Sequence, residues 1–380
     1  MSMQVRLEDL RKGVDRLLSA LYAIEMRRDV PSIHLLAHDK GLDLFAYKDG
    51  VRVKVSVPTL TTENFSLWMS GASLLSALAK SNAEVAELKI ASSNIAYQST
   101  ARTLYLNQIA LHAQTEAPPH DTHNCLHASV LLPTALIQAA AQTAAHFADP
   151  DPLPHQAAFA GVFFEFSALQ TRIAATDGYV LVLETLKGTT ISVNNNLIIP
   201  AKIIKAFAGA GAERDVVNLT VRELLSHEQT IELATKDVEV VGKAIDRRFV
   251  SYEHLFLEPR PNFAIIDRKS LLKAIRPYRA KRYVGMALRF KDGVLFMSAI
   301  EAGGKESDNK EAPAAFFQCK HSGPPMRIAF SPQKLLSILE KIETKEIILR
   351  MSDPTRPALI EPTSQATNRE LIFLIMPCLL

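Results

Sequence analysis

The chain has 380 residues, enough for two to four domains of ordinary size. Hydrophobic residues make up 48% and charged residues 22%, which excludes a disordered, collagen-like or coiled-coil protein. Basic and acidic side chains nearly cancel, 43 against 40 with a net charge of +3, so a nucleic-acid site would need an uneven distribution of charge. Three cysteines without a C-x-x-C pair exclude a disulfide framework and a zinc ribbon, and they indicate a reducing, cytoplasmic environment.

No targeting or membrane segment is expected. The N-terminus is charged from Arg6 onward and has no apolar h-region, so no signal peptide is predicted. The longest stretch without Asp, Glu, Lys or Arg runs from Thr122 to Ala148 and contains a proline, two glutamines and three histidines. This stretch predicts a strand and a packed helix, because a membrane helix needs about 20 predominantly apolar residues.

Six helices are predicted in chain order, about one for every 63 residues of the 380. The segment from Leu131 to Ile137 matches the segment from Ile198 to Ile204 position by position, at an offset of 67. In each copy a short apolar strand precedes a Ser, Asp or Pro start signal and an apolar-periodic helix. The helices are expected to begin near residues 7, 71, 133, 200, 268 and 332.

Strands are predicted between the helices by alternation of apolar and polar residues. The clearest are residues 42–47, 51–57, 172–175, 179–184, 286–290 and 294–298. Asp-Gly pairs at 49–50, 177–178 and 292–293 predict the turns between them.

The pattern predicts an α+β fold, with helices on one face of antiparallel sheets. Six repeats pair into three similar domains, 1–122, 123–260 and 261–380, each made of two helix-plus-sheet repeats. Turn-rich sequence at 117–121 and 258–262 marks the two boundaries, and residues 303–310 predict a loop inside the third domain.

No enzyme, metal or cofactor is expected. Ser331-Pro-Gln-Lys334 and Ser307-Asp308-Asn309 match two penicillin-binding signatures, but they occur in the wrong order and without K-T-G, so Ser331 predicts a helix cap. His120, His123, Cys125 and His127 form one run without a second ligand pair, which favours a solvated linker over zinc. Gly209-Ala210-Gly211 follows a helix and predicts its C-cap, not a dinucleotide loop.

Several strings together resemble one family, the bacterial replicative sliding clamp, which is the beta subunit of DNA polymerase III. Residues 172–181, RIAATDGYVL, are similar to the family's V-A-T-D-G-H-R-L. Residues 244–252, AIDRRFVSY, resemble I-D-G-x-F-P-D-Y, and residues 373–380, FLIMPCLL, resemble Y-V-V-M-P-M-R-L. The resemblance spans all three domains and is weakest in the first.

The resemblance implies a DNA-clamp fold in a head-to-tail homodimeric ring, with six helices per subunit lining a hole through which double-stranded DNA passes. Basic helix residues would attract phosphates without reading sequence. The third helix has no Lys or Arg, and its polar stripe of Gln138, Gln142 and His146 would stand in for them. The implied DNA-binding residues are Arg11, Lys12, Arg16, Arg27, Arg28, Gln138, Gln142, Lys202, Lys205, Lys273, Arg276 and Arg279.

The resemblance also implies a pocket for short linear motifs of the polymerase III catalytic subunit, the clamp loader and other clamp-binding proteins. Its lining would be Phe159, Thr176, Gly178, Tyr179, Val180, Leu181, Val250, His254, Leu255, Leu374, Ile375, Met376, Pro377, Cys378 and Leu379. The dimer contact would join an edge strand at 102–108, carrying Leu104 and Leu106, to the region of Tyr278.

The pocket departs from the family at three positions: Val180 replaces an Arg, Val250 a Pro, and Leu379 a basic residue. A more apolar, less basic pocket is expected, which would bind acidic peptides more weakly. This leaves two alternatives open: a secondary or specialised clamp with an altered partner motif, and a non-enclosing interaction module. A hydrolase built on the same repeats would need a nucleophile that the sequence does not show.

Overall fold

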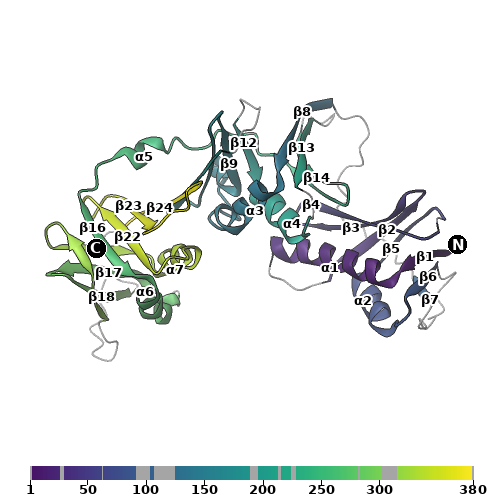
Figure 1. Cartoon of the computed structure of the whole chain (residues 1–380), viewed down its shortest axis with the longest axis horizontal. Helices are drawn as coiled ribbons and strands as arrows, with labels where there is room; N and C mark the ends of the chain where they lie inside the picture. The colour runs from purple at the N-terminus through teal and green to yellow at the C-terminus, as the bar shows by residue number, and fades with distance from the viewer. Residues whose placement is uncertain are drawn as a thin grey trace. The chain divides into compact units, whose positions relative to one another are not determined.

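The computed structural model describes residues 2–25, 30–61, 63–90, 103–106, 125–188, 196–212, 215–223, 228–280, 283–301 and 315–378. The chain forms two compact units: unit 1 holds Met1–Ala141 and Ile199–Asp246, and unit 2 holds Gln142–Ile198 and Arg247–Leu380. Figure 1 colours the elements of both in chain order. The division into three domains stays a prediction. No described helix is long and apolar enough to cross a membrane.

Unit 1 contains four helices and eleven strands among its described residues. Its helices are α1 (Leu7–Ile24), α2 (Gly71–Lys80), α3 (Thr134–Gln142) and α4 (Ala201–Gly209). Its strands are β1 (Ser2–Arg6), β2 (Ser32–His38), β3 (Gly41–Lys48), β4 (Val51–Val57), β5 (Phe65–Ser70), β6 (Val85–Ile90), β7 (Thr103–Leu106), β8 (Cys125–Pro133), β13 (Val216–Glu223), β14 (Gln229–Ala234) and β15 (Val238–Lys243).

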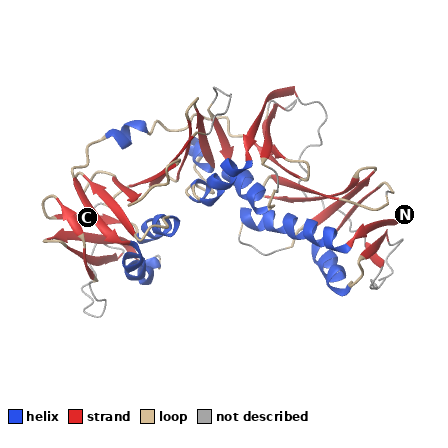
Figure 2. Cartoon of the chain, in the orientation of Figure 1, coloured by secondary structure: helices blue, strands red, loops and turns tan. Residues whose placement is uncertain are grey.

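One eight-stranded sheet dominates unit 1, in the order β5-β2-β3-β4-β15-β14-β13-β8, beside a small β1-β6-β7 sheet. Helix α1 buries Leu10, Leu17 and Leu21 and contacts β3, β4 and α4. Figure 2 shows α1 and α2 along one side of strands β2 to β5. Alternate residues of β4 are buried, as the period-two pattern predicts for a sheet with one covered face.

Unit 2 contains three α-helices, three short 3-10 helices and thirteen strands among its described residues. The helices are α5 (Glu253–Leu257), α6 (Arg268–Ile275), α7 (Pro332–Lys341), η1 (Ala144–His146), η2 (Pro154–Ala160) and η3 (Arg276–Arg279). The strands are β9 (Gly161–Phe166), β10 (Gln170–Thr176), β11 (Val180–Lys187), β12 (Leu197–Pro200), β16 (Asn262–Asp267), β17 (Tyr283–Lys291), β18 (Val294–Glu301), β19 (Phe316–Gln318), β20 (Lys320–Ser322), β21 (Met326–Phe330), β22 (Glu346–Met351), β23 (Ala358–Pro362) and β24 (Arg369–Ile375).

A nine-stranded sheet forms the main layer of unit 2, in the order β12-β9-β10-β11-β24-β23-β22-β16-β20. A second sheet has the order β19-β18-β17-β21. The predicted α+β fold with antiparallel sheets is confirmed, with one exception. Strands β6 and β7 pair in parallel, whereas every other pair whose register is described is antiparallel.

The six predicted helices are confirmed, and each begins within one residue of its expected start. Five of them follow a strand directly, because β1, β5, β8, β12 and β16 lead into α1, α2, α3, α4 and α6. Ser331 alone separates β21 from α7. The side chains of Ser70, Asp267 and Ser331 accept hydrogen bonds from backbone N–H groups of the first turns of α2, α6 and α7. Local capping chemistry therefore sets these starts, and the predicted cap at Ser331 is confirmed.

Two predicted hairpin turns have the backbone that Asp-Gly favours. The φ angles are 49° and 73° at Asp49 and Gly50, and 51° and 75° at Asp292 and Gly293. Positive φ at both central residues matches the right-handed twist of the paired strands. The C-cap at the end of α4 is also confirmed, because Gly211 has a φ of 63° and its N–H donates to the carbonyl of Ala208.

Candidate functional site

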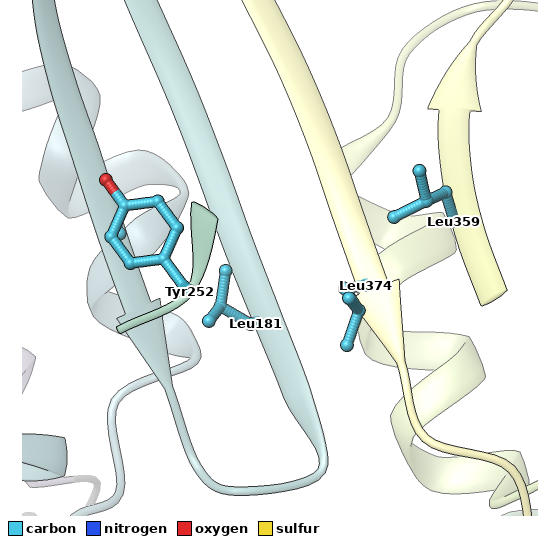
Figure 3. Packing of buried hydrophobic residues seen from close by; sticks show 5 residues of the cluster. Leu181, Tyr252, Leu359 and Leu374 are labelled. Atoms are coloured by element: carbon cyan, nitrogen blue, oxygen red, sulfur yellow. The ribbon is translucent and has the colours of Figure 1, made fainter. Parts of the chain in front are cut away.

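The end of the chain is built into the middle of the unit 2 sheet. Strand β24 pairs with β11 on one side and with β23 on the other. Leu374 lies in register with Leu181 of β11 and with Leu359 of β23. Figure 3 shows these three leucines with Tyr252, which comes from the segment before α5. The apolar C-terminal sequence is thus a packed strand.

These side chains form an apolar cluster that contains three of the residues predicted to line a peptide pocket. Leu181, Leu374, Leu359, Ala174 and Tyr252 are buried in it. Partly buried hydrophobic residues pack against it, namely Phe163, Leu183, Phe249, Leu255, Phe256 and Ile372. The structure therefore brings together Leu181, Leu255 and Leu374, which are distant in sequence. We call the five buried residues and the six partly buried residues together the apolar cluster.

Three other predicted lining residues are buried elsewhere. Val180 and Ile375 face each other across β11 and β24, and both side chains are at most 1% exposed. Because successive residues of a strand point to opposite faces, both lie on the face of the sheet opposite the apolar cluster. Thr176 is also buried, and its hydroxyl donates to the carbonyl of Val180 over 2.7 Å. In this structure Val180, Ile375 and Thr176 are therefore buried and are not exposed to a ligand.

Two exposed side chains lie where β11 and β24 meet their loops. Tyr179 is 65% exposed and Met376 is 40% exposed. They are neighbours, because the N–H of Met376 donates to the carbonyl of Tyr179 over 2.8 Å. We call Tyr179 and Met376 the exposed rim.

The other residues predicted to line the peptide pocket are exposed or partly buried, except Leu379, which is not described. Val250 is 38% exposed, His254 is exposed on α5, and Gly178 is exposed with the ring of Phe159 beside it. Pro377 and Cys378 are partly buried, and the N–H of Cys378 donates to the carbonyl of Ala329 over 2.8 Å. Leu379 lies outside the described residues.

A tight turn presents Tyr179. Oδ1 of Asp177 accepts hydrogen bonds from the backbone N–H groups of Tyr179 and Val180, at 2.9 and 2.8 Å. Gly178 has a φ of 85°, which glycine adopts at little steric cost, and its N–H donates to Oγ1 of Thr176. The other carboxylate oxygen of Asp177 accepts from Nζ of Lys334 in the first turn of α7, over 2.5 Å. The ammonium group of Lys334 lies 5.7 Å from the ring centroid of Tyr179.

Two polar side chains, those of Tyr252 and Arg260, hold the segment that carries Val250 and Leu255. The Tyr252 hydroxyl donates to Oε2 of Glu165 over 3.2 Å. Burial, and then the carboxylates of Glu165 and Glu253, raise the pKa of Tyr252 above its usual value. The guanidinium group of Arg260 donates to three carbonyls, those of Leu255, Glu258 and Pro357, at 2.7, 2.9 and 3.1 Å. These contacts were not predicted from the sequence.

The basic residues of α1 fall into two groups. Nη2 of Arg11 donates to the carbonyls of Leu78 and Ser81 at 2.8 and 2.6 Å, at the C-terminal end of α2. Arg16 donates to the carbonyls of Ala210 and Gly211 at the end of α4, and it pairs with Asp237 at 2.8 Å. These two arginines cap helix ends, where cations are favourable. Lys12 is exposed and has no side-chain partner among the described residues.

The other predicted DNA-binding residues differ in exposure. In unit 2, Lys273, Arg276 and Arg279 are exposed, and their side chains have no ion-pair partner in the described part of the chain. In unit 1, Lys202 and Lys205 of α4 are half-buried, and burial lowers the pKa of Lys205. Gln138, Gln142 and His146 of the predicted polar stripe are exposed. Arg27 and Arg28 lie outside the described residues.

The predicted dimer residues are only partly described. Leu104 and Leu106 lie in β7, whose backbone pairs with β6. Tyr278 is half-buried in η3, directly after α6. The sequence predicted a solvated linker, not a zinc site, at His120, His123, Cys125 and His127. Cys125 and His127 instead belong to strand β8, and His120 and His123 lie outside the described residues. Within the described residues, no group of three or more His, Cys, Asp or Glu side chains is arranged to hold a metal ion.

The C-terminal third of the chain matches a known family. Residues 257–378 match the model described as "DNA polymerase III beta subunit, C-terminal domain". Among curated proteins, the chain is 24% identical over 223 residues to the "Beta sliding clamp" of Rickettsia felis, and 23% identical over 221 residues to that of Pseudomonas putida. The matched part spans 58% and 57% of the length of those relatives, and 57% of this chain.

Solved structures extend the similarity of fold to the whole chain. The DNA polymerase III beta subunit of Thermotoga maritima is 18% identical, with a TM-score of 0.76, covering 100% of this chain and 99% of that one. The DNA polymerase III subunit beta of Pseudomonas aeruginosa is also 18% identical, with a TM-score of 0.77, and the match covers 100% of both chains. The predicted clamp fold is therefore confirmed.

Proposed function

We propose that this chain, a divergent member of the bacterial beta sliding clamp family, acts as a DNA sliding clamp. Two copies would close a ring around duplex DNA and tether the replicative polymerase and other partners to it. The observation that carries this proposal is the family match over residues 257–378, which include β24, Met376 and Lys334 of the candidate site. The fold of the whole chain agrees with it.

We assign the twelve helices of the ring to two subunits of three domains each, with the boundaries predicted from the sequence. DNA contact would come from exposed cations such as Lys12, Lys273, Arg276 and Arg279. Their charges attract phosphates without base contacts, so the attraction is independent of sequence and falls with salt. A ring can rely on such contacts because enclosure, not affinity, keeps it on the DNA.

A peptide-binding surface is the second part of the proposal. The exposed rim, Tyr179 and Met376, and the partly buried Leu255 supply accessible apolar area, and Leu181 and Leu374 are buried in the same cluster as Leu255. Binding sites for peptides combine such apolar area with a few polar anchors. The clamp loader, the polymerase III catalytic subunit and other proteins with clamp-binding motifs are the proposed occupants.

The experiment that tests the proposal asks whether the protein is held on DNA by topology. The full chain is loaded onto a nicked circular plasmid with the clamp loader of the source organism and ATP, and complexes are separated by gel filtration. Protein should elute with the circle and should leave when a restriction enzyme linearises it. Protein that stays equally well on linear DNA would be an ordinary DNA binder. Protein that never associates with the circle would instead support a non-enclosing interaction module.

A further inference from the structure

Lys334 brings a positive charge to the exposed rim from a different part of the chain. Its position in the first turn of α7 is 157 residues away from Asp177, the carboxylate with which it pairs. Its ammonium group also lies 5.7 Å from the ring centroid of Tyr179. A cation within about 6 Å of an aromatic face is attracted by the ring, so this contact helps to fix the orientation of Tyr179.

The charges of this pair are unequally accessible. The side chain of Asp177 is 14% exposed, whereas that of Lys334 is 36% exposed. Both carboxylate oxygens of Asp177 are occupied, one by two backbone N–H groups and the other by Lys334. The ammonium group has three donor hydrogens, and Asp177 is its only ion-pair partner among the described residues. The pair therefore presents its positive end to solvent, beside the exposed rim.

We propose that Lys334, with Tyr179, recognises a carboxylate of the partner segment that binds the apolar cluster. This inference rests on the proposed function of that surface as a peptide-binding site. The occupant is a flexible peptide with an apolar anchor and an Asp or Glu close to it in sequence. The anchor packs on the cluster, and the carboxylate accepts a hydrogen bond from the ammonium group of Lys334.

The proposal reverses an expectation drawn from the sequence. Replacement of basic residues at Val180 and Leu379 predicted weaker binding of acidic peptides. Val180 is fully buried on the opposite face of the sheet and contributes no charge to the exposed rim. Lys334 supplies that charge from α7.

The test compares peptides that differ by one charge. Nine-residue peptides carry a Leu-Phe anchor in a Gly/Ser background, with Asp placed at each flanking position in turn and Asn in the matched twin. Binding to the full chain is measured by calorimetry at low salt. At one flanking position or more, the Asp peptide should bind about threefold to fivefold more tightly than its Asn twin, the gain expected for an accessible ion pair. This preference should shrink as salt rises.

Three variants locate the preference. Lys334→Gln should remove it, so that each Asp peptide binds no more tightly than its Asn twin, and Lys334→Arg should retain it. Lys345→Gln removes an equal exposed charge beyond the C-terminal end of α7 and should change nothing. Thermal unfolding of each variant shows whether the fold is intact, and Lys334→Arg keeps the test valid if Lys334→Gln unfolds.

The outcomes separate this inference from the proposed function. If Asp and Asn peptides bind equally at every position, or if Lys334→Gln keeps the preference, the recognition role of Lys334 is overturned while the peptide site stands. If no peptide binds the wild-type chain, the peptide site is overturned, and the role of Lys334 with it. Ring retention on circular DNA is measured independently of both results.

Discussion

The hydroxyl group of Tyr252 donates a hydrogen bond of 3.2 Å to Oε2 of Glu165, which also lies 3.4 Å from Nη1 of Arg172. Tyr252 is only 1% exposed and is buried in the apolar cluster with Leu181. Its ring makes edge contacts with the rings of Phe163, Phe249 and Phe256. This one residue thus joins the segment before α5 both to the core of unit 2 and to a polar partner on β9.

Tyr252→Phe should remove the hydrogen bond and keep the packing. The free energy of unfolding should fall by about 1 kcal/mol, the usual net contribution of such a bond. Tyr252→Ala should lower it by about 3–5 kcal/mol, because it also leaves a cavity. Urea unfolding followed by fluorescence checks both values. Equal effects of the two substitutions would show that packing contributes nothing here.

The raised pKa of Tyr252 predicts a loss of stability at alkaline pH. The folded state holds the phenol proton more tightly than the unfolded chain does, so the contribution is fully present below the ordinary tyrosine pKa of about 10. It is lost as pH rises from there through the raised value. In urea unfolding between pH 8 and 11, the wild type should lose more stability than Tyr252→Phe. Parallel curves would contradict this.

Removing the charge of an exposed cation should weaken DNA binding, whereas removing that of a capping arginine should lower stability. Reversing Lys273 and Arg276 to Glu should weaken DNA association, and each lost phosphate contact should lower the salt slope by about 1. Arg16→Gln, in contrast, removes hydrogen bonds at the end of α4 and should lower thermal stability with little change in that slope. DNA binding titrated against salt, with dimer size as a control, distinguishes the two. An unchanged slope in the double variant would place those residues away from DNA.

Leu104→Asp should shift the protein toward monomer. A charged side chain on β7 would oppose the pairing of this strand with the partner subunit that the clamp proposal requires. Light scattering at micromolar concentration measures the change, with Thr103→Asp at the alternating position of the strand as the matched control. A monomeric wild type under these conditions would contradict the ring itself.

The segment around Leu255 should depend on the hydrogen bonds of Arg260 for its stability. Arg260→Ala leaves three carbonyls without their donor and should lower stability by about 2 kcal/mol, with weaker peptide binding and faster amide exchange over α5. Arg260→Lys should recover part of the effect. Arg356→Ala, which removes a largely exposed arginine 3.9 Å from Glu258, is the control and should have little effect.

Sequence reasoning succeeded where the controlling chemistry is local. Ser331 and Asp267 cap the helices that follow them, and Asp49-Gly50 makes its own turn, so helix starts and hairpins could be read from a few neighbouring residues. The side-chain roles of Arg16 and Lys334 could not, because their partners are 194 and 157 residues away. Basic residues at similar helix positions cap helix ends in some cases, as Arg16 does, and stay exposed in others, as Lys273 does. Only the contacts in the folded structure distinguish the two roles.

The position of β24 has a consequence for the synthesis of the chain. Strand β11 is complete at residue 187, but β24, its neighbour in the sheet, begins only at Arg369. At about 5–20 residues per second, the ribosome needs roughly 10–40 s to supply it. During that interval one long edge of β11 has no native partner, and such an edge invites association with other chains. The nascent protein is therefore vulnerable to aggregation during this interval, and chaperones or slower expression at low temperature should raise its soluble yield.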